Sequence, residues 1–254
     1  MAALTGKGVR VGSLARVLSD DEVERALVVT AHPDDVDFSA AGTIATWTGA
    51  GIKVTYCVIT DGDAGGFDPS VPRDRIGPIR QAEQRAAAAE VGVHDVVFLG
   101  YPDGRLAVSF PLRRDIARVI RQVRPQRLLC QSPHRNLVRM PASHPDHLAA
   151  GEATLCAVYP DARNPFAFPE LMEEGLEEWS VAETWVMSNA EVNHYVDVTD
   201  VYDRKVAALR AHASQMEGVA DLDGLLHRWL GGNAQQAGWP AGRLAEAYFV
   251  VDTA

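Results

Sequence analysis

The sequence predicts an α/β fold, a Rossmann-like three-layer sandwich with a mostly parallel central sheet. Short apolar runs rich in β-branched residues alternate with helix-like segments along most of the chain. Such runs are typical of strands buried on both faces, and parallel strands need long, usually helical connections between them. The 254 residues contain no internal repeat, low-complexity tract or linker, so we expect a single domain over residues 1–254.

Each predicted element has its own local signal. The first strand, residues 25–30, precedes a helix over residues 42–50 that Gly51 ends. Residues 79–91 form an alanine-rich helix, and residues 111–124 form an amphipathic one. The remaining expected strands are residues 54–60, 95–99, 127–130 and 183–187, and the remaining expected helices are residues 145–158 and 201–215.

Composition and charge exclude several classes of protein. The chain is 47% hydrophobic and 23% charged, which is ordinary for a globular protein. Its net charge of -10 argues against a surface for nucleic acid or anionic membrane. The N-terminal stretch lacks the apolar core of a secretory signal, and no window approaches the roughly 18 apolar residues of a membrane span. We expect a cytoplasmic protein with no nucleic-acid or membrane partner, and a closed homo-oligomer as the default assembly.

The three cysteines do not form a recognisable framework. Cys57, Cys130 and Cys156 are odd in number and widely spaced, and the first two lie in strand-like runs. Small thiols are common in buried strands. We therefore expect neither a disulfide scaffold nor a cysteine zinc site.

Two short strings combine imidazole and carboxylate groups at close spacing. The string AHPDD at residues 31–35 follows the first strand, and SHPDH at residues 143–147 lies in the connection after the fourth. The acidic, glycine-rich loop 61–66 and residues 101–104 follow the second and third strands. Because functional residues of parallel sheets gather beyond the carboxyl ends of the strands, we expect all four segments to lie together.

Helix capping explains only part of these strings. Ser143 is a good N-cap, and Asp146 three residues later completes something close to a capping box. Asp34 or Asp35 could cap the helix that follows the first strand. None of these caps requires a histidine, so the imidazoles need another explanation.

A metal site supplies that explanation. His32, Asp35 and His147 form a two-histidine, one-carboxylate set, which is typical of catalytic zinc sites that keep a position open for water. Asp34 and His144 remain, and hydrolysis needs two further groups: one to take a proton from water and one to act on the departing side. The leading hypothesis is a metal-dependent hydrolase.

With these motifs the chain resembles the LmbE-like (PIG-L-type) deacetylases, zinc enzymes that remove acetyl groups from molecules containing N-acetylglucosamine. The resemblance extends through nearly the whole chain. Its motifs, in order, are AHPDD at 31–35, TDGDAGG at 60–66, Arg80-x-x-Glu83, FLGxxDG at 98–104, HPDH at 144–147 and KxxALxxHxSQ at 205–215.

The resemblance implies a role for each residue of the two strings. It implies zinc held by His32, Asp35 and His147, although such ligand sets also accept Fe²⁺ or another divalent metal. It implies that Asp34 is the general base, and that His144 stabilises the oxyanion and protonates the leaving amine.

Three further residues gain expected roles. Asp146 is placed to orient or charge-balance His144, because a helix N-terminus disfavours an imidazolium. Arg80 and Asp103 are expected to contact the sugar. The alternatives for the arginine are a solvated charge on the helix and a structural Arg80–Glu83 pair.

The expected substrate is a small molecule with an N-acetylated amino sugar, such as a sugar conjugate of a thiol cofactor or of a secondary metabolite. One alternative is a metal-dependent amidase that removes a larger acyl or thiol-conjugate group. A nucleotide-binding module is a weaker alternative, because the G-x-G-x-x-G fingerprint is absent and Asp61 and Asp63 would repel a pyrophosphate.

Some positions depart from the family pattern or have no assigned role. Val36 replaces a common glutamate, with Asp37 next, and Ala142 replaces a tyrosine found in some members. The loop 132–140 is the candidate specificity element. Residues 205–215 are expected to be structural, with His212 a hydrogen-bonded packing histidine. Residues 219–254 are expected to dock over the core or wall the pocket.

Overall fold

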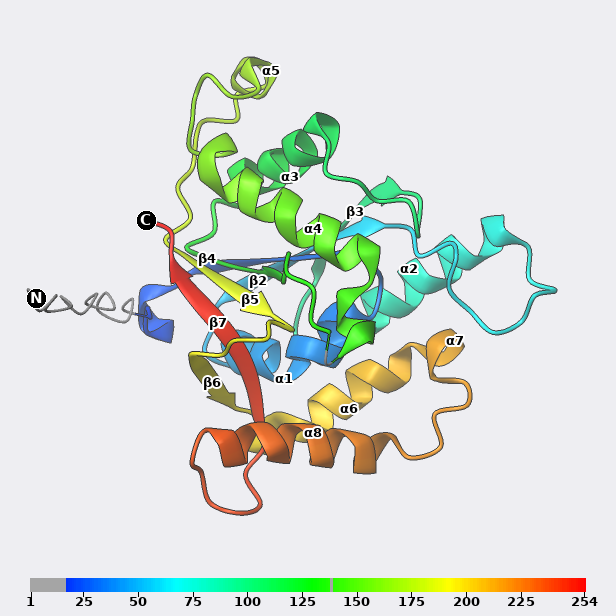
Figure 1. Ribbon diagram of the computed structural model, residues 1–254. Helices are drawn as coiled ribbons and strands as arrows, with labels where there is room; N and C mark the ends of the chain where they lie inside the picture. The colour runs from blue at the N-terminus through cyan, green and yellow to red at the C-terminus, as the bar shows by residue number, and fades with distance from the viewer. Residues whose placement is uncertain (1–16, 138) are drawn as a thin grey trace, which may run out of the picture.

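A seven-stranded sheet in the order β3-β2-β1-β4-β5-β7-β6 forms the centre of the computed structural model, which describes residues 17–137 and 139–254 (Figure 1). Strands β1 to β5 pair in parallel, whereas β7 is antiparallel to both of its neighbours. The predicted α/β fold with a mostly parallel sheet is confirmed. The strands are β1 (Arg25–Thr30), β2 (Lys53–Thr60), β3 (Asp95–Tyr101), β4 (Arg127–Gln131), β5 (Glu183–Met187), β6 (His194–Asp197) and β7 (Ala245–Asp252).

Helices cover both faces of the sheet, because alternate residues of each central strand point to opposite sides. In β1, Ala26 and Val28 pack with α1 and α2, whereas Leu27 and Val29 pack with α3 and α4. Figure 1 shows α3 and α4 on one side of the sheet and α1 on the other. The α-helices are α1 (Asp35–Gly49), α2 (Arg73–Glu90), α3 (Phe110–Val123), α4 (Pro145–Cys156), α5 (Pro169–Glu173), α6 (Tyr202–Ala211), α7 (Ala213–Met216) and α8 (Leu222–Gln236).

Several boundaries differ from the prediction. Helix α1 begins at Asp35, directly after the first string, and α2 begins at Arg73 although Pro78 lies inside it. A proline in the second turn removes one hydrogen bond near a helix start, which costs less than a break in the interior. The expected helix over residues 201–215 is interrupted at His212, which separates α6 from α7.

The carboxyl ends of the parallel strands lie at one edge of the sheet, where the four expected segments converge. Backbone bonds from Thr60 to Ala31 (2.8 Å) and from Asp61 to Tyr101 (3.0 Å) join the first three segments. The Gln131 amide oxygen, at the end of β4, accepts from Ala31 N at 2.9 Å. The edge thus positions the candidate site.

Two sequence expectations concern a secretory signal and a membrane span. Residues 1–16, where we expect no secretory signal, lie outside the described residues. Within the described ranges, no helix combines the length and apolar character needed to cross a bilayer.

Candidate active site and metal centre

The AHPDD string makes a tight turn between β1 and α1. Asp35 begins α1 and its carboxylate accepts from His32 N at 2.7 Å, which closes the turn. Asp34 occupies the left-handed region, with φ 97° and ψ −27°. That conformation costs a residue other than glycine about 1–3 kcal/mol, so the surrounding contacts must hold it.

Three donor groups from the two strings, two imidazoles and one carboxylate, lie in contact with one another. His147 Nε2 is 3.2 Å from His32 Nδ1 and 2.9 Å from Asp35 Oδ1, and His32 Nδ1 is 3.3 Å from Asp35 Oδ2. Ligand atoms around a tetrahedral ion with bonds of roughly 2.0–2.2 Å stand about 3.3–3.6 Å apart. The two imidazoles and the carboxylate therefore fit the ligand set of one divalent ion, and their role as metal ligands stays a prediction.

The other nitrogen of His32 faces two carboxylates. His32 Nε2 lies 3.0 Å from Asp103 Oδ1 and 3.1 Å from Asp146 Oδ2. A histidine that binds a metal through one nitrogen commonly donates the other N–H to a carboxylate. By that rule Nδ1 would be the ligand atom. Two overlapping sets of donor atoms, each within 4.8 Å, could hold an ion: His32, His144 and His147, or His32, Asp103 and Asp146.

The electrostatics of the site favour a bound cation. Burial opposes a charge on His32, but Asp35, Asp103 and Asp146 raise its pKa to about 12. Burial and the neighbouring Asp35 raise the pKa of Asp34 to about 6, against the opposing effect of Arg80. Four carboxylates thus share a mostly buried site with one guanidinium. A divalent ion, which binds imidazoles in their neutral form, would supply the positive charge that these carboxylates otherwise draw from His32 and His147.

The second string begins α4, but His144 rather than Ser143 is the N-cap. Its Nδ1 accepts from Asp146 N at 3.2 Å, while the Ser143 hydroxyl exchanges hydrogen bonds with the backbone of Asn136. The expected Ser143 cap is therefore wrong. Pro145 explains the outcome, because the residue before a proline is pushed into an extended conformation, as the cap position requires.

His144 and Asp146 are close but joined differently from the expectation. The Asp146 carboxylate accepts from Gly104 N at 2.7 Å and from Leu106 N at 3.1 Å, and it faces His32. The hydrogen bond between Asp146 and His144 is made instead by the backbone N–H of Asp146. Burial and the nearby His32 lower the pKa of His144, more than Asp146 raises it. With Nδ1 as an acceptor, the neutral ring carries its proton on Nε2.

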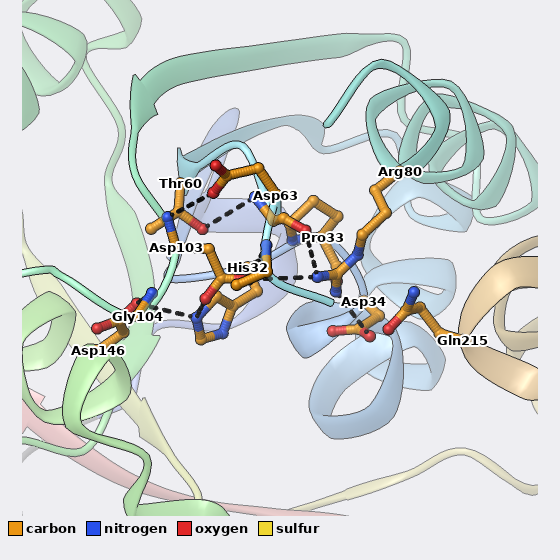
Figure 2. A network of polar contacts seen from close by, with 12 residues as sticks. His32, Pro33, Asp34, Thr60, Asp63, Arg80, Asp103, Gly104, Asp146 and Gln215 are labelled. Atoms are coloured by element: carbon orange, nitrogen blue, oxygen red, sulfur yellow. Dashed lines mark hydrogen bonds and ion pairs between the residues drawn. The ribbon is translucent and has the colours of Figure 1, made fainter. Parts of the chain in front are cut away.

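Arg80 lies beneath Asp34 rather than against Glu83. Its Nη2 donates to Pro33 O at 2.6 Å and to Asp34 Oδ2 at 3.1 Å, and its Nη1 donates to Gly62 O at 3.0 Å (Figure 2). The side chain is 4% exposed. A Cβ at Gly62 or at its neighbour Gly65 would collide with this guanidinium, so the glycine-rich loop provides the space for it. Contact of Arg80 with a sugar stays a prediction.

Asp103 joins the arginine to the histidine. Its Oδ1 faces His32, and its Oδ2 lies 3.6 Å from Arg80 Nη1 and accepts from Ala64 N at 3.4 Å (Figure 2). The carboxylate is 8% exposed. Its expected contact with a sugar likewise stays a prediction.

A pocket of about 490 Å³ opens beside the candidate ligands. Helix α8 supplies its apolar wall, which confirms that the C-terminal region borders the pocket. The Arg139 guanidinium lies 4.1 Å from the Trp229 ring centre at this wall. The lining residues are Asp35, Phe38, Ser39, Gln131, Arg139, Pro141, Ala142, His147, Ser188, Leu225 and Trp229.

Comparison with known proteins agrees with this geometry. Residues 27–158, which include both strings, match the sequence model of PIG-L, the GlcNAc-PI de-N-acetylase family. The chain belongs to this family. The PIG-L family is a deacetylase family, and deacetylases act on amide bonds, so the enzyme class expected from the sequence is confirmed.

Two relatives and one solved structure show how far the likeness to other PIG-L proteins extends. The chain is 32% identical over 195 residues to diacetylchitobiose deacetylase of Thermococcus kodakarensis, covering 77% of this chain and 71% of the relative. It is 32% identical over 196 residues to a probable N-acetyl-alpha-D-glucosaminyl L-malate deacetylase 2 of Bacillus anthracis, covering 74% and 80%. The structure of N,N'-diacetylchitobiose deacetylase from Pyrococcus horikoshii, complexed with its inhibitor MPG, superposes with a TM-score of 0.84 at 25% identity, covering 92% and 85%.

Proposed function

We propose that this protein is a zinc-dependent N-deacetylase of a small molecule that contains N-acetylglucosamine. The observation that carries the proposal is the convergence of His32 Nδ1, His147 Nε2 and the Asp35 carboxylate within 2.9–3.3 Å. Family membership and relatives that deacetylate amino-sugar compounds support it.

His32, Asp35 and His147 would hold the ion. When bound, a divalent ion lowers the pKa of water and polarises the acetyl carbonyl. Zinc suits two imidazoles and a carboxylate, and Fe²⁺ is the main alternative for the same donors. Asp103 and Asp146 fix the ring of His32 from the far side, as carboxylates commonly do for histidine ligands.

Asp34 and His144 would move the protons. Asp34 borders Asp35 at the first string, so it takes the proton of the attacking water as general base. His144 is placed to donate from Nε2 to the carbonyl oxygen as that oxygen gains charge. While Nδ1 accepts from Asp146 N, the ring has no second proton to give, so protonated Asp34 is the better source for the leaving amine.

The pocket between residues 139–142, at the end of the predicted specificity loop 132–140, and α8 would receive the rest of the substrate. Its volume of about 490 Å³ lies in the range of small-molecule sites, roughly 300–1,000 Å³. Arg139, Pro141 and Ala142 line it from the loop side. The candidate specificity element thus borders the candidate ligands, which favours a sugar conjugate as substrate.

The test is release of primary amine from a panel of N-acetylglucosaminides by zinc-loaded protein, with a chelated sample as control. We expect chelator-sensitive release from at least one compound, and the ranking would begin to define the group attached to the sugar. No release from any compound, by protein shown to hold metal, would contradict the proposal.

A further inference from the structure

A chain of buried polar side chains connects the main chain of Asp34 to the segment between α6 and α7. Asp34 N donates to Gln84 Oε1 at 2.8 Å, and Gln84 Nε2 donates to Asp37 Oδ2 at 2.8 Å. His212 Nε2 lies 2.8 Å from the same Asp37 oxygen. Gln84, Asp37 and His212 are each 0% exposed.

This chain has a fixed direction. A carboxylate only accepts hydrogen bonds, so Asp37 requires the nitrogen of the Gln84 amide on its side. The amide oxygen must then face Asp34 N, which needs an acceptor. If the amide turned over, two donors would face each other at Asp34. His212 donates to Asp37 and so holds in place the carboxylate that determines the orientation of the Gln84 amide.

Helix α2 therefore holds Asp34 at two points. Arg80 and Gln84 are four residues apart and lie on one face of the helix. Arg80 contacts the Asp34 carboxylate, and Gln84 binds its backbone N–H. Asp34 needs such support, because its φ of 97° lies where only glycine is unstrained.

We infer that Gln84, Asp37 and His212 are positioning residues that hold the Asp34 main chain in its left-handed conformation and so aim the Asp34 carboxylate. The inference rests on the proposed function, because it takes Asp34 as the base. It gives His212 a role beyond packing. It also gives Asp37, next to Val36, a link to the turn at Asp34 through Gln84.

The experiment compares Gln84→Leu, Asp37→Leu and Asp37→Asn with the wild type. In the described part of the chain Asp37 Oδ1 has no hydrogen-bond partner, so asparagine can present its oxygen where Oδ2 accepts. We expect Gln84→Leu and Asp37→Leu to lower kcat about 10- to 100-fold, with KM and bound metal nearly unchanged. Asp37→Asn should restore most of kcat. Ser214→Ala, which removes a contact from α7 to Glu83 on α2, is the control for packing alone and should leave kcat unchanged.

Hydrogen exchange of the Asp34 amide, measured by NMR, tests the inference without any substrate. We expect slow exchange in the wild type and in Asp37→Asn, and faster exchange in Gln84→Leu. Unchanged exchange and unchanged kcat per metal-loaded molecule in Gln84→Leu would overturn the inference. Equal losses in Asp37→Asn and Asp37→Leu would also overturn it, because charge rather than hydrogen-bond geometry would then matter. Because exchange does not depend on turnover, failure of the deacetylase assay alone would count against the proposed function only.

Discussion

At the scale of single residues, a substitution of Asp34 best distinguishes loss of catalysis from loss of metal binding. Asp34 touches Arg80 and borders the candidate ligand Asp35, but His32, Asp35 and His147 make the proposed donor set without it. An asparagine at this position would keep an acceptor for Arg80, and asparagine tolerates the left-handed conformation well. We expect Asp34→Asn to retain one ion per chain and to lower turnover roughly 10²- to 10⁴-fold, measured by metal analysis and amine release.

His147→Ala is the matched comparison for that variant. It removes one of the two imidazoles from the donor set, so metal content should fall together with activity. Full metal occupancy in His147→Ala would refute the ligand assignment. Near-normal turnover in Asp34→Asn would refute the assignment of the base.

At the scale of elements, the local sequence predicted the five parallel strands of the sheet and missed the other two. β1 and β5 are apolar runs with their own signals, and β5 was predicted at its observed bounds. β6 and β7 are strands because they pair with distant segments of the chain. β7 lies antiparallel to β5, and β6 is a four-residue edge strand paired with β7. No local pattern specifies such long-range pairing, so for residues 219–254 we could expect only that they cover the core or wall the pocket, with no strand among them.

The candidate site, like the sheet, was predicted only in part. Motifs placed His32, Asp35 and His147 together, because strand ends at one sheet edge must converge. The direction of the Asp146 carboxylate was not predictable, since it depends on backbone N–H groups of Gly104 and Leu106 in a separate loop. Gln84 was missed because a single glutamine on a helix carries no sequence signal of its role.

The burial of two cysteines in the strands predicts which thiols of the protein are reactive. Cys57 in β2 and Cys130 in β4 are 0% exposed, and burial raises the pKa of each thiol to about 12. Thiolates are the reactive form, so both should be inert in the folded protein. Cys156, near the end of α4, is only partly buried. We expect Ellman's reagent to label one thiol per native chain and three thiols after denaturation. The native Cys156→Ser variant should show no labelling. Rapid labelling of two or more thiols in the native chain would contradict the burial of Cys57 and Cys130.

The pocket wall formed by residues 139–142 and α8 allows a prediction about substrate specificity. Arg139 is the cationic lining residue, and it lies over the apolar face of Trp229. A substrate with an anionic group beyond the sugar would gain a charged hydrogen bond there, worth about 1.5–3 kcal/mol. We expect Arg139→Gln to lower kcat/KM roughly 10- to 100-fold for anionic conjugates and much less for neutral ones.

Arg135→Gln is the control, because Arg135 lies on the same loop, contacts Ser143 O and does not line the pocket. Equal losses for anionic and neutral conjugates in Arg139→Gln would exclude charge recognition at this wall.

At the scale of the whole molecule, the fold concentrates acidic groups at one edge of the sheet. Four carboxylates lie around His32 and Arg80, in a chain whose net charge is already -10. Like charges in a mostly buried site repel one another, and their repulsion opposes folding. The cytoplasmic location and the homo-oligomer expected from the sequence stay predictions.

A bound ion should therefore stabilise the whole fold. An ion that binds only the folded chain at about 100 times its Kd adds about 2.7 kcal/mol to the free energy of unfolding. For a chain of this size that corresponds to a rise in Tm of roughly 5–10 °C. We expect added Zn²⁺ to raise Tm by this order and a chelator to reverse the change, measured by calorimetry. His147→Ala should show little of the shift, because its donor set is incomplete. If Zn²⁺ raised the Tm of His147→Ala as much as that of the wild type, the stabilising ion would have to lie elsewhere, and the link between the catalytic edge and global stability would be wrong.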